Sequence, residues 1–156
     1  MNNASHLVDV LTKKGLTIGS VESFTGGLFA KTITDVSGAS KCFKGGLVTY
    51  SKELKMKLLG MSEEFIDTNG IVSWGVAKEM AIKGQRVLDV DICVSFTGNA
   101  GPNTCPGDAD VGEIYMAIVY KGQVWPIPLR LEAEREKVRQ IAVESLIDTV
   151  ISIVGK

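Results

Sequence analysis

The sequence predicts one α/β domain in which a mostly parallel sheet carries helices on both faces and ends in an antiparallel hairpin. Two patterns lead to this prediction. Apolar runs of strand length alternate with segments of helical periodicity, and two strand-like segments near the C-terminus are joined by a short Lys-Gly turn. The length of 156 residues suits a single core, and we find no internal repeat, low-complexity tract or linker.

A βαβ unit is expected in the N-terminal third of the chain. Apolar residues recur at helical spacing behind Ser5, which we expect to cap this helix, and Gly15 ends it before a short strand over 16–21. A second helical stripe follows a pair of adjacent glycines and leads to a strand over 46–50. This second helix therefore crosses over between two parallel strands.

The rest of the chain continues the alternation. Continuous apolar runs indicate buried strands, whereas apolar residues three and four positions apart indicate helices. We expect a helix over 52–59, a short helix that opens at 62–64 and a third over 74–88. Strands over 91–96, 112–120 and 123–131 follow, and then a long amphipathic helix over 132–154.

Composition favours a globular protein with a small-molecule partner. Hydrophobic residues make up 45% of the chain, charged residues 22%, and the net charge is -1. With a pI near 5.9, no overall positive field exists for a nucleic acid or an anionic membrane, so neither partner is expected. Cys42, Cys93 and Cys105 form no Cys-x-x-Cys pair, which suits a reducing compartment. We find no signal peptide and no apolar stretch of about 18 residues, and therefore expect a cytoplasmic protein.

The segment Val-Glu-Ser-Phe-Thr-Gly-Gly is the first candidate site. It joins a buried strand to a helix, and ligands of open α/β sheets bind at this carboxyl edge. Ser23 would face the pocket, while Gly26, Gly27 and the N–H groups of the next helical turn would bind an anion or an oxyanion. The alternative is that Ser23 or Thr25 only caps the helix and that Glu22 is a surface carboxylate.

Tyr50 and Lys55 form the second candidate site, because both can point over the same sheet edge as Ser23. The only histidine, His6, lies in the first helix, so a lysine is the natural base for a serine nucleophile. For this role the pKa of Lys55 must fall by roughly three units, worth about 4 kcal/mol, through desolvation or a neighbouring cation. The alternatives are that Lys55 belongs to a solvated helix face or is only an electrostatic clamp.

A Gly/Pro/Asn/Asp-rich loop after the strand over 91–96 is the third candidate site. It is too long for a turn, and such loops often hold ligands, although an insertion without a role would look the same. Asp108 and Asp110 have no spaced His, Cys or carboxylate partners, so no metal site is expected. The backbone donors expected at the sheet edge belong to Thr97, Gly98, Ala100 and Gly101.

The last helix carries two further features. Arg135 and Arg139 are four positions apart on one face, and two guanidinium groups suit a phosphate, although interleaved glutamates would equally make a salt-bridged helix start. The helix also has more apolar residues than one core face needs, which predicts a subunit contact in a homo-oligomer. These residues are Ile141, Val143, Ile147, Val150 and Ile151.

Five ordered motifs make the chain similar to a known family. They read Glu-Ser-Phe-Thr-Gly-Gly, Gly-Gly-Leu-Val-Thr-Tyr-Ser-Lys-Glu-Leu-Lys, Asn-Gly-Ile-Val-Ser, Thr-Gly-Asn-Ala-Gly-Pro and Val-Gly. Together they resemble the CinA C-terminal domain family over essentially the whole chain, residues 1–156. The resemblance implies a three-layer α/β/α sandwich. It also implies an enzyme of pyridine-nucleotide salvage that deamidates nicotinamide mononucleotide to nicotinic acid mononucleotide and ammonia.

The resemblance implies roles for individual residues as well. It makes Ser23 the nucleophile and Lys55 the general base, with Tyr50 beside them. It assigns Thr97 and Gly98 to the nucleotide pocket, and the two arginines of the last helix to the phosphate.

The chain departs from the family pattern in three places. Phe24 replaces the usual Cys and Asn99 the usual Ile, and neither change removes a catalytic group. Ala109 and Asp110 stand where the family usually has Lys-Pro, so the family's contacts through this loop are not carried over.

We therefore expect acyl transfer to water. Ser23, deprotonated by Lys55, attacks the carboxamide carbon, ammonia leaves, and water releases the acyl group, while N–H groups near Gly26 and Gly27 stabilise the oxyanion. This chemistry needs neither redox nor electrophilic help, so no cofactor is expected. One rival is a nucleotide-binding or partner-binding module that keeps the pocket without the reaction. A second rival is a hydrolase of a different small amide.

Overall fold

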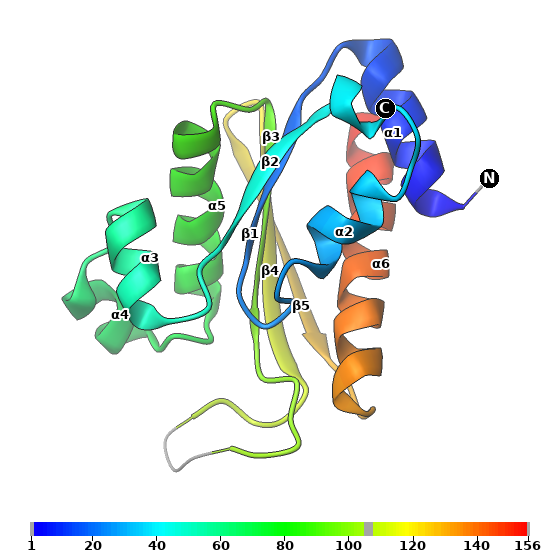
Figure 1. Ribbon diagram of the computed structural model, residues 1–156. Helices are drawn as coiled ribbons and strands as arrows, with labels where there is room; N and C mark the ends of the chain where they lie inside the picture. Colours follow the sequence, from blue (N-terminus) through cyan, green and yellow to red (C-terminus); the bar gives the residue numbers. More distant parts are fainter. Residues whose placement is uncertain (1, 105–107, 156) are drawn as a thin grey trace.

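The computed structural model describes residues 2–104 and 108–155. Its strands are β1 (Ile18–Glu22), β2 (Phe43–Val48), β3 (Ile92–Gly98), β4 (Glu113–Tyr120) and β5 (Gln123–Arg130). Its helices are α1 (Asn3–Lys14), α2 (Leu28–Thr34), α3 (Lys52–Leu59), α4 (Glu63–Asn69), α5 (Trp74–Leu88) and α6 (Arg135–Val154), with a 3-10 helix η1 (Ala39–Lys41) before β2. Figure 1 shows the sheet as the middle of three layers, with α3, α4 and α5 on one face and α1, α2 and α6 on the other.

Four of the five strands run in the same direction. The sheet has the order β2-β1-β3-β4-β5. β1 pairs in parallel with β2 and β3, while β4 pairs antiparallel with β3 and β5, so that only β4 is reversed. The predicted fold class is therefore confirmed: a three-layer α/β/α sandwich with a mostly parallel sheet and an antiparallel hairpin.

Three predicted elements begin three positions away from their observed starts. The cap of α1 is Asn2, whose side-chain oxygen accepts the Ser5 N–H at 2.8 Å, so Ser5 lies inside the first turn. β2 occupies 43–48 rather than 46–50. α6 begins at Arg135, three positions later than expected, because the preceding glutamate has extended backbone and stands at the N-cap.

Apolar side chains of the two helix layers bury both faces of the sheet. Val143, Ile147 and Val150 of α6 pack in the core and are at most 2% exposed. This corrects the prediction that they form a subunit contact, for which only the partly buried Ile141 and Ile151 remain. The homo-oligomer stays a prediction. Within the described residues, no helix is both long enough and apolar enough to cross a membrane.

Two cysteines are buried free thiols. Cys93 lies in the core on the α5 face, where burial raises its pKa to about 12, so it packs as a small apolar group. Cys42 is buried in the core on the opposite face. Cys105 lies outside the described residues.

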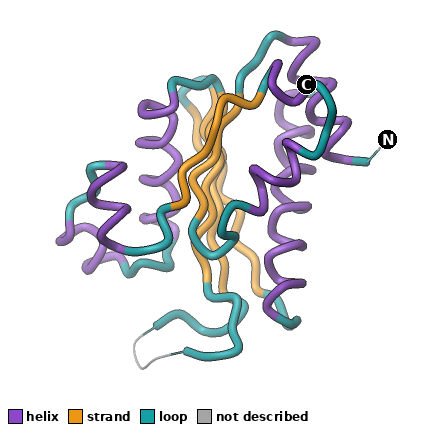
Figure 2. Tube along the Cα trace, in the orientation of Figure 1, coloured by secondary structure: helices purple, strands orange, loops and turns teal. Residues whose placement is uncertain are grey.

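The carboxyl ends of the parallel strands meet at one edge of the sheet. The turn over 23–27 follows β1, Thr49 and Tyr50 follow β2, and the long loop that begins at Asn99 follows β3 (Figure 2). Segments that are distant in the sequence are thereby brought to the edge where open α/β sheets bind ligands.

Candidate active site

Ser23 is the first residue after β1, at the rim of the sheet. Its backbone N–H donates to the Phe96 carbonyl of β3 at 3.0 Å, and the residue is 9% exposed. Because side chains alternate along a strand, Ser23 and the preceding Glu22 point to opposite faces. Ser23 therefore faces the layer that contains α3.

Lys55 lies in the second turn of α3. The helix starts at Ser51, whose hydroxyl accepts the Leu54 N–H at 3.1 Å. Lys55 is 0% exposed, and its Nζ atom donates to the Thr49 carbonyl at 2.5 Å. The same Nζ lies 3.1 Å from the Ser23 hydroxyl oxygen. The two groups expected to act together are therefore in hydrogen-bond contact.

Burial has a direct consequence for the charge of this lysine. Desolvation lowers the pKa of Lys55 from its ordinary value of 10.5 to about 8. The neutral amine has one lone pair for the Ser23 hydroxyl proton and N–H groups for the Thr49 carbonyl. A solvated helix face is therefore the wrong interpretation for Lys55, although it fits Lys52, which pairs with Asp67 at 2.9 Å.

Glu22 is buried, which corrects its interpretation as a surface carboxylate. It is 1% exposed, and its oxygens accept hydrogen bonds from the Thr25 hydroxyl at 2.8 Å and from the N–H groups of Phe29 at 2.8 Å and Ala30 at 3.1 Å. The N-cap of α2 is Gly27, which has a φ of 101° and offers no side chain. The carboxylate of Glu22, and not a hydroxyl of the turn, therefore caps α2.

Some N–H groups of the turn are already used. Gly26 donates its N–H to the Ser23 carbonyl at 3.0 Å, and the first N–H groups of α2 donate within the turn and to the buried carboxylate. This corrects the expectation that they are free for an oxyanion. Among the described residues, the N–H groups of Phe24, Thr25 and Gly27 meet no acceptor, so these three remain available.

A cavity of about 300 Å³ opens beside Ser23. It has the size and mixed polarity of a site for a small molecule. The predicted residues that line it are Ser23, Tyr50, Thr97, Gly98, Ala100 and Arg135. The predicted residues outside its lining are Lys55, Thr25, Gly26, Gly27, Gly101 and Arg139.

Sequence reasoning missed the wall contributed by the connection between α4 and α5. Ile71 and Val72 line the cavity, and the Ile71 carbonyl accepts the Thr97 hydroxyl at 2.8 Å. The signal for this wall is the Asn-Gly-Ile-Val-Ser motif, which contains both residues. Asn103 and Asp108 also line the cavity.

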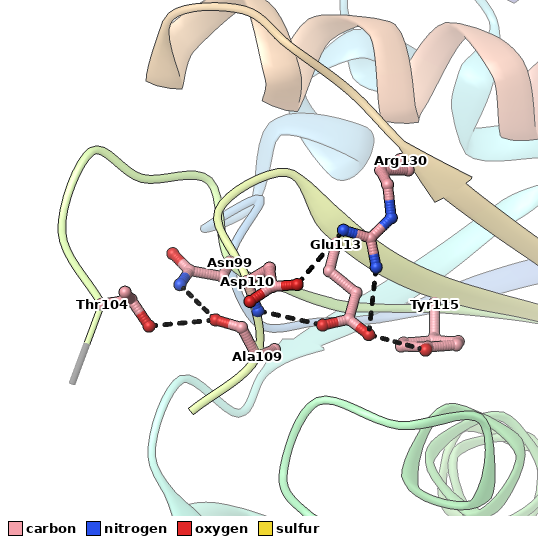
Figure 3. A network of polar contacts seen from close by, with 7 residues as sticks. All are labelled: Asn99, Thr104, Ala109, Asp110, Glu113, Tyr115 and Arg130. Carbon is pink, nitrogen blue, oxygen red and sulfur yellow. Dashed lines mark hydrogen bonds and ion pairs between the residues drawn. The ribbon is translucent and has the colours of Figure 1, made fainter. Parts of the chain in front are cut away.

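Polar contacts anchor the loop that follows β3 (Figure 3). They join its described parts to each other and to the hairpin, so these parts have a defined course. The described parts of the loop are therefore anchored, and their role in holding a ligand stays a prediction. The bonds connect Asn99 and Thr104 to the Ala109 carbonyl, each at 3.0 Å, Asp110 to Glu113 at 3.0 Å and to Arg130 at 3.3 Å, and Tyr115 to Glu113 at 2.9 Å. Over residues 2–104 and 108–155, no three His, Cys, Asp or Glu side chains gather as metal ligands do.

The two arginines of α6 reach different parts of the site. Arg135 lines the cavity and donates to the Gly101 carbonyl at 2.7 Å and to the Tyr50 hydroxyl at 3.3 Å. Arg139 instead donates to the Thr25 carbonyl at 2.8 Å. Neither forms an ion pair with a described glutamate, so the salt-bridged helix start is the wrong interpretation.

Comparison with known proteins supplies the family. The family model described as CinA C-terminal domain matches residues 2–154. The chain belongs to the CinA C-terminal domain family. A CinA-like protein of Flavobacterium psychrophilum is 40% identical over 141 residues, which cover 90% of this chain and 34% of that protein. The Protein MG115 homolog of Mycoplasma pneumoniae is 35% identical over 151 residues, 96% of each chain. This CinA domain thus spans about a third of the first relative and nearly all of the second.

Solved structures share the fold of this CinA domain. A CinA superfamily protein of Escherichia coli superposes with a TM-score of 0.93 at 27% identity, over 97% of this chain and 88% of that one. The competence/damage inducible protein CihA of Agrobacterium tumefaciens gives a TM-score of 0.90 at 27% identity, over 100% and 98%. The resemblance inferred from the motifs is therefore confirmed.

Proposed function

We propose that this CinA domain is a hydrolase that deamidates nicotinamide mononucleotide to nicotinic acid mononucleotide and ammonia. The observation that supports this most is the 3.1 Å contact between the buried Lys55 amine and the Ser23 hydroxyl, beside a cavity of about 300 Å³. A hydroxyl paired with a base is the arrangement that activates a serine nucleophile. The choice of substrate rests on the family resemblance of the motifs.

The first half of the reaction forms an ester on Ser23. As the Ser23 oxygen attacks the carboxamide carbon, its proton passes to the neutral Lys55 amine. The tetrahedral intermediate then expels ammonia, whose nitrogen takes that proton from the Lys55 ammonium. The Thr49 carbonyl, 2.5 Å from Nζ, keeps the amine aimed at the serine in both steps.

The second half releases the acid. Water, deprotonated by the neutral Lys55, attacks the ester carbon, and the Ser23 oxygen leaves with the proton. The negative oxygen of both intermediates needs donors. The unused N–H groups of Phe24, Thr25 and Gly27 are the candidates, and one well-placed donor contributes about 3 to 4 kcal/mol in comparable sites.

The cavity provides the proposed contacts for the nucleotide. Arg135 is a cation in its lining, which suits the phosphate, and Thr97, Gly98 and Ala100 form the wall at the end of β3. Tyr50 lines the same cavity as Ser23, and its hydroxyl accepts a hydrogen bond from Arg135. Arg139 holds the turn carbonyl and lies outside the lining, so its proposed contact with the phosphate is less direct.

The binding-module rival makes a different use of the same residues. It needs Lys55 as a charged clamp that meets the ligand, whereas the amine is fully buried and lies outside the cavity lining. These observations favour the hydrolase.

The test is the release of ammonia and nicotinic acid mononucleotide from nicotinamide mononucleotide. Wild type should release both in equal amounts, Ser23→Ala should release neither, and Ser40→Ala, at an exposed serine of η1, should match wild type. Equal rates for wild type and Ser23→Ala, or no release by either, would defeat the proposal. If a panel of small amides shows turnover of a different amide that depends on Ser23, the proposed substrate is wrong and the proposed serine mechanism stands.

A further inference from the structure

Glu22 has a buried carboxylate that the proposed chemistry does not use, directly before the nucleophile in the sequence. We propose that Glu22 is a positioning residue, whose carboxylate fixes the turn after Ser23 by capping α2 from the preceding strand. This inference rests on the proposed function, because the group that is positioned is the Ser23 hydroxyl.

The cap is needed because α2 has none of its own. Gly27 stands at the N-cap without a side chain, so the N–H groups of the first turn depend on another acceptor. Glu22 supplies it: one carboxylate oxygen accepts the Phe29 N–H at 2.8 Å and the other the Ala30 N–H at 3.1 Å. A negative group at this end also interacts favourably with the helix dipole.

The hydrogen bonds of Glu22 hold its carboxylate in a fixed position. Each described partner of its oxygens donates a hydrogen bond to the carboxylate. The remaining donors are the hydroxyls of Thr25 at 2.8 Å and Ser20 at 3.3 Å. Since the side chain also points away from the Lys55 face, it neither gives nor takes a proton in the reaction but acts through the backbone.

Glu22 links both partners of the catalytic pair. Its backbone carbonyl accepts the Thr49 N–H at 2.8 Å, and the Thr49 carbonyl in turn accepts the Lys55 amine at 2.5 Å. Its carboxylate holds Thr25, which lies two positions after Ser23. Glu22 therefore holds the base through its backbone carbonyl and the turn after Ser23 through its carboxylate. Loss of the carboxylate removes only the contact that holds the turn.

The experiment compares Glu22→Gln with Ser62→Ala. Gln keeps the size of the side chain but replaces an acceptor oxygen by an NH2 group that faces N–H donors. Ser62→Ala removes the cap of α4, whose hydroxyl accepts the Phe65 N–H at 3.0 Å, and so serves as a matched loss of a helix cap away from the site. For ammonia release, Glu22→Gln should lower kcat by about 10-fold to 100-fold with KM changed less than about 3-fold, because a displaced nucleophile slows chemistry more than binding. Ser62→Ala should keep wild-type kcat.

A second readout does not need the substrate. The rate at which a fluorophosphonate modifies Ser23, followed by intact mass, should fall in Glu22→Gln by a factor similar to that in kcat. Thr25→Val, which removes one donor to the carboxylate and keeps its charge, should lower both rates less, by about 3-fold, and provides the test should Glu22→Gln not fold.

Two results overturn the inference alone: wild-type kcat and labelling rate in a folded Glu22 variant, or an equal loss of kcat in Ser62→Ala. A wild-type protein that turns over no amide and is not labelled at Ser23 would instead remove the proposed function, and the inference with it.

Discussion

The Nζ atom of Lys55 lies 3.1 Å from the Oγ atom of Ser23, although 32 positions separate them in the chain. The contact arises from the crossover topology. Ser23 directly follows β1, Lys55 follows β2 in α3, and the parallel pairing of β1 and β2 brings both to one edge of the sheet. The Thr49 carbonyl completes the arrangement by fixing the amine at 2.5 Å.

The buried amine should destabilise the folded protein at neutral pH. The pKa of Lys55 is lowered to about 8 in the folded protein from its ordinary 10.5, so between these values the unfolded chain holds a proton that the folded chain has released. The free energy of unfolding therefore rises with pH across this window. Below the window both states hold the proton, so Lys55 adds no pH dependence there. Lys55→Met, similar in length but uncharged, should be inactive and more stable than wild type at about pH 7, by about 2 kcal/mol in urea unfolding.

Lys57→Met is the matched control for this stability measurement, because Lys57 is an exposed lysine of the same helix. Between about pH 8 and pH 10.5, the difference in unfolding free energy from wild type should shrink with pH for Lys55→Met and stay constant for Lys57→Met. Parallel behaviour of the two variants would show that burial does not set the pKa of Lys55.

The two arginines of α6 should affect different kinetic constants. Arg135 lines the cavity, so Arg135→Gln should raise KM for nicotinamide mononucleotide by about 10-fold to 100-fold, the range for a charge-assisted hydrogen bond, with a smaller change in kcat. Arg139 holds the Thr25 carbonyl, so Arg139→Gln should mainly lower kcat. Steady-state kinetics with Arg86→Gln, an exposed arginine of α5, controls for net charge. An unchanged KM in Arg135→Gln would exclude this residue from substrate binding.

Gly112 should be the most sensitive glycine of the loop. Its φ is 83°, and an added Cβ would lie 1.9 Å from the Leu131 carbonyl oxygen. Gly112→Ala should therefore lower the free energy of unfolding by more than about 3 kcal/mol, since left-handed strain alone costs about 1 to 2 kcal/mol. Gly122 has a similar φ of 73°, but an added Cβ there would meet no atom within 4 Å. Gly122→Ala should therefore show only the left-handed strain. Equal losses in thermal unfolding would mean that the carbonyl moves aside.

Local signals were sufficient for most elements. The predicted helices over 52–59 and 74–88 match α3 and α5, because a serine caps each start and its hydroxyl is free to accept an N–H. The first helix was misjudged because Asn2 and Ser5 are equally good caps, and only the structure shows which one accepts.

Other features depend on partners that are distant in the sequence. The strand expected over 46–50 instead begins at Phe43, and its close pairing with β1 shows at Gly46, where a Cβ would lie 2.5 Å from the Ser20 hydroxyl oxygen. The burial of Glu22 follows from a helix that has no cap of its own, which spacing alone does not reveal. Likewise, four-residue spacing placed the two arginines on one face, but only the packing of α6 decides which of them reaches the cavity.

The pH dependence of kcat/KM for ammonia release from nicotinamide mononucleotide tests the role of Lys55 most directly. A base must be deprotonated to act, so kcat/KM should rise about tenfold per pH unit at low pH and level off above an apparent pKa of about 8. Lys55→Met should show no turnover at any pH in this range. A profile that is flat through pH 8, or wild-type kcat/KM in Lys55→Met, would contradict the account.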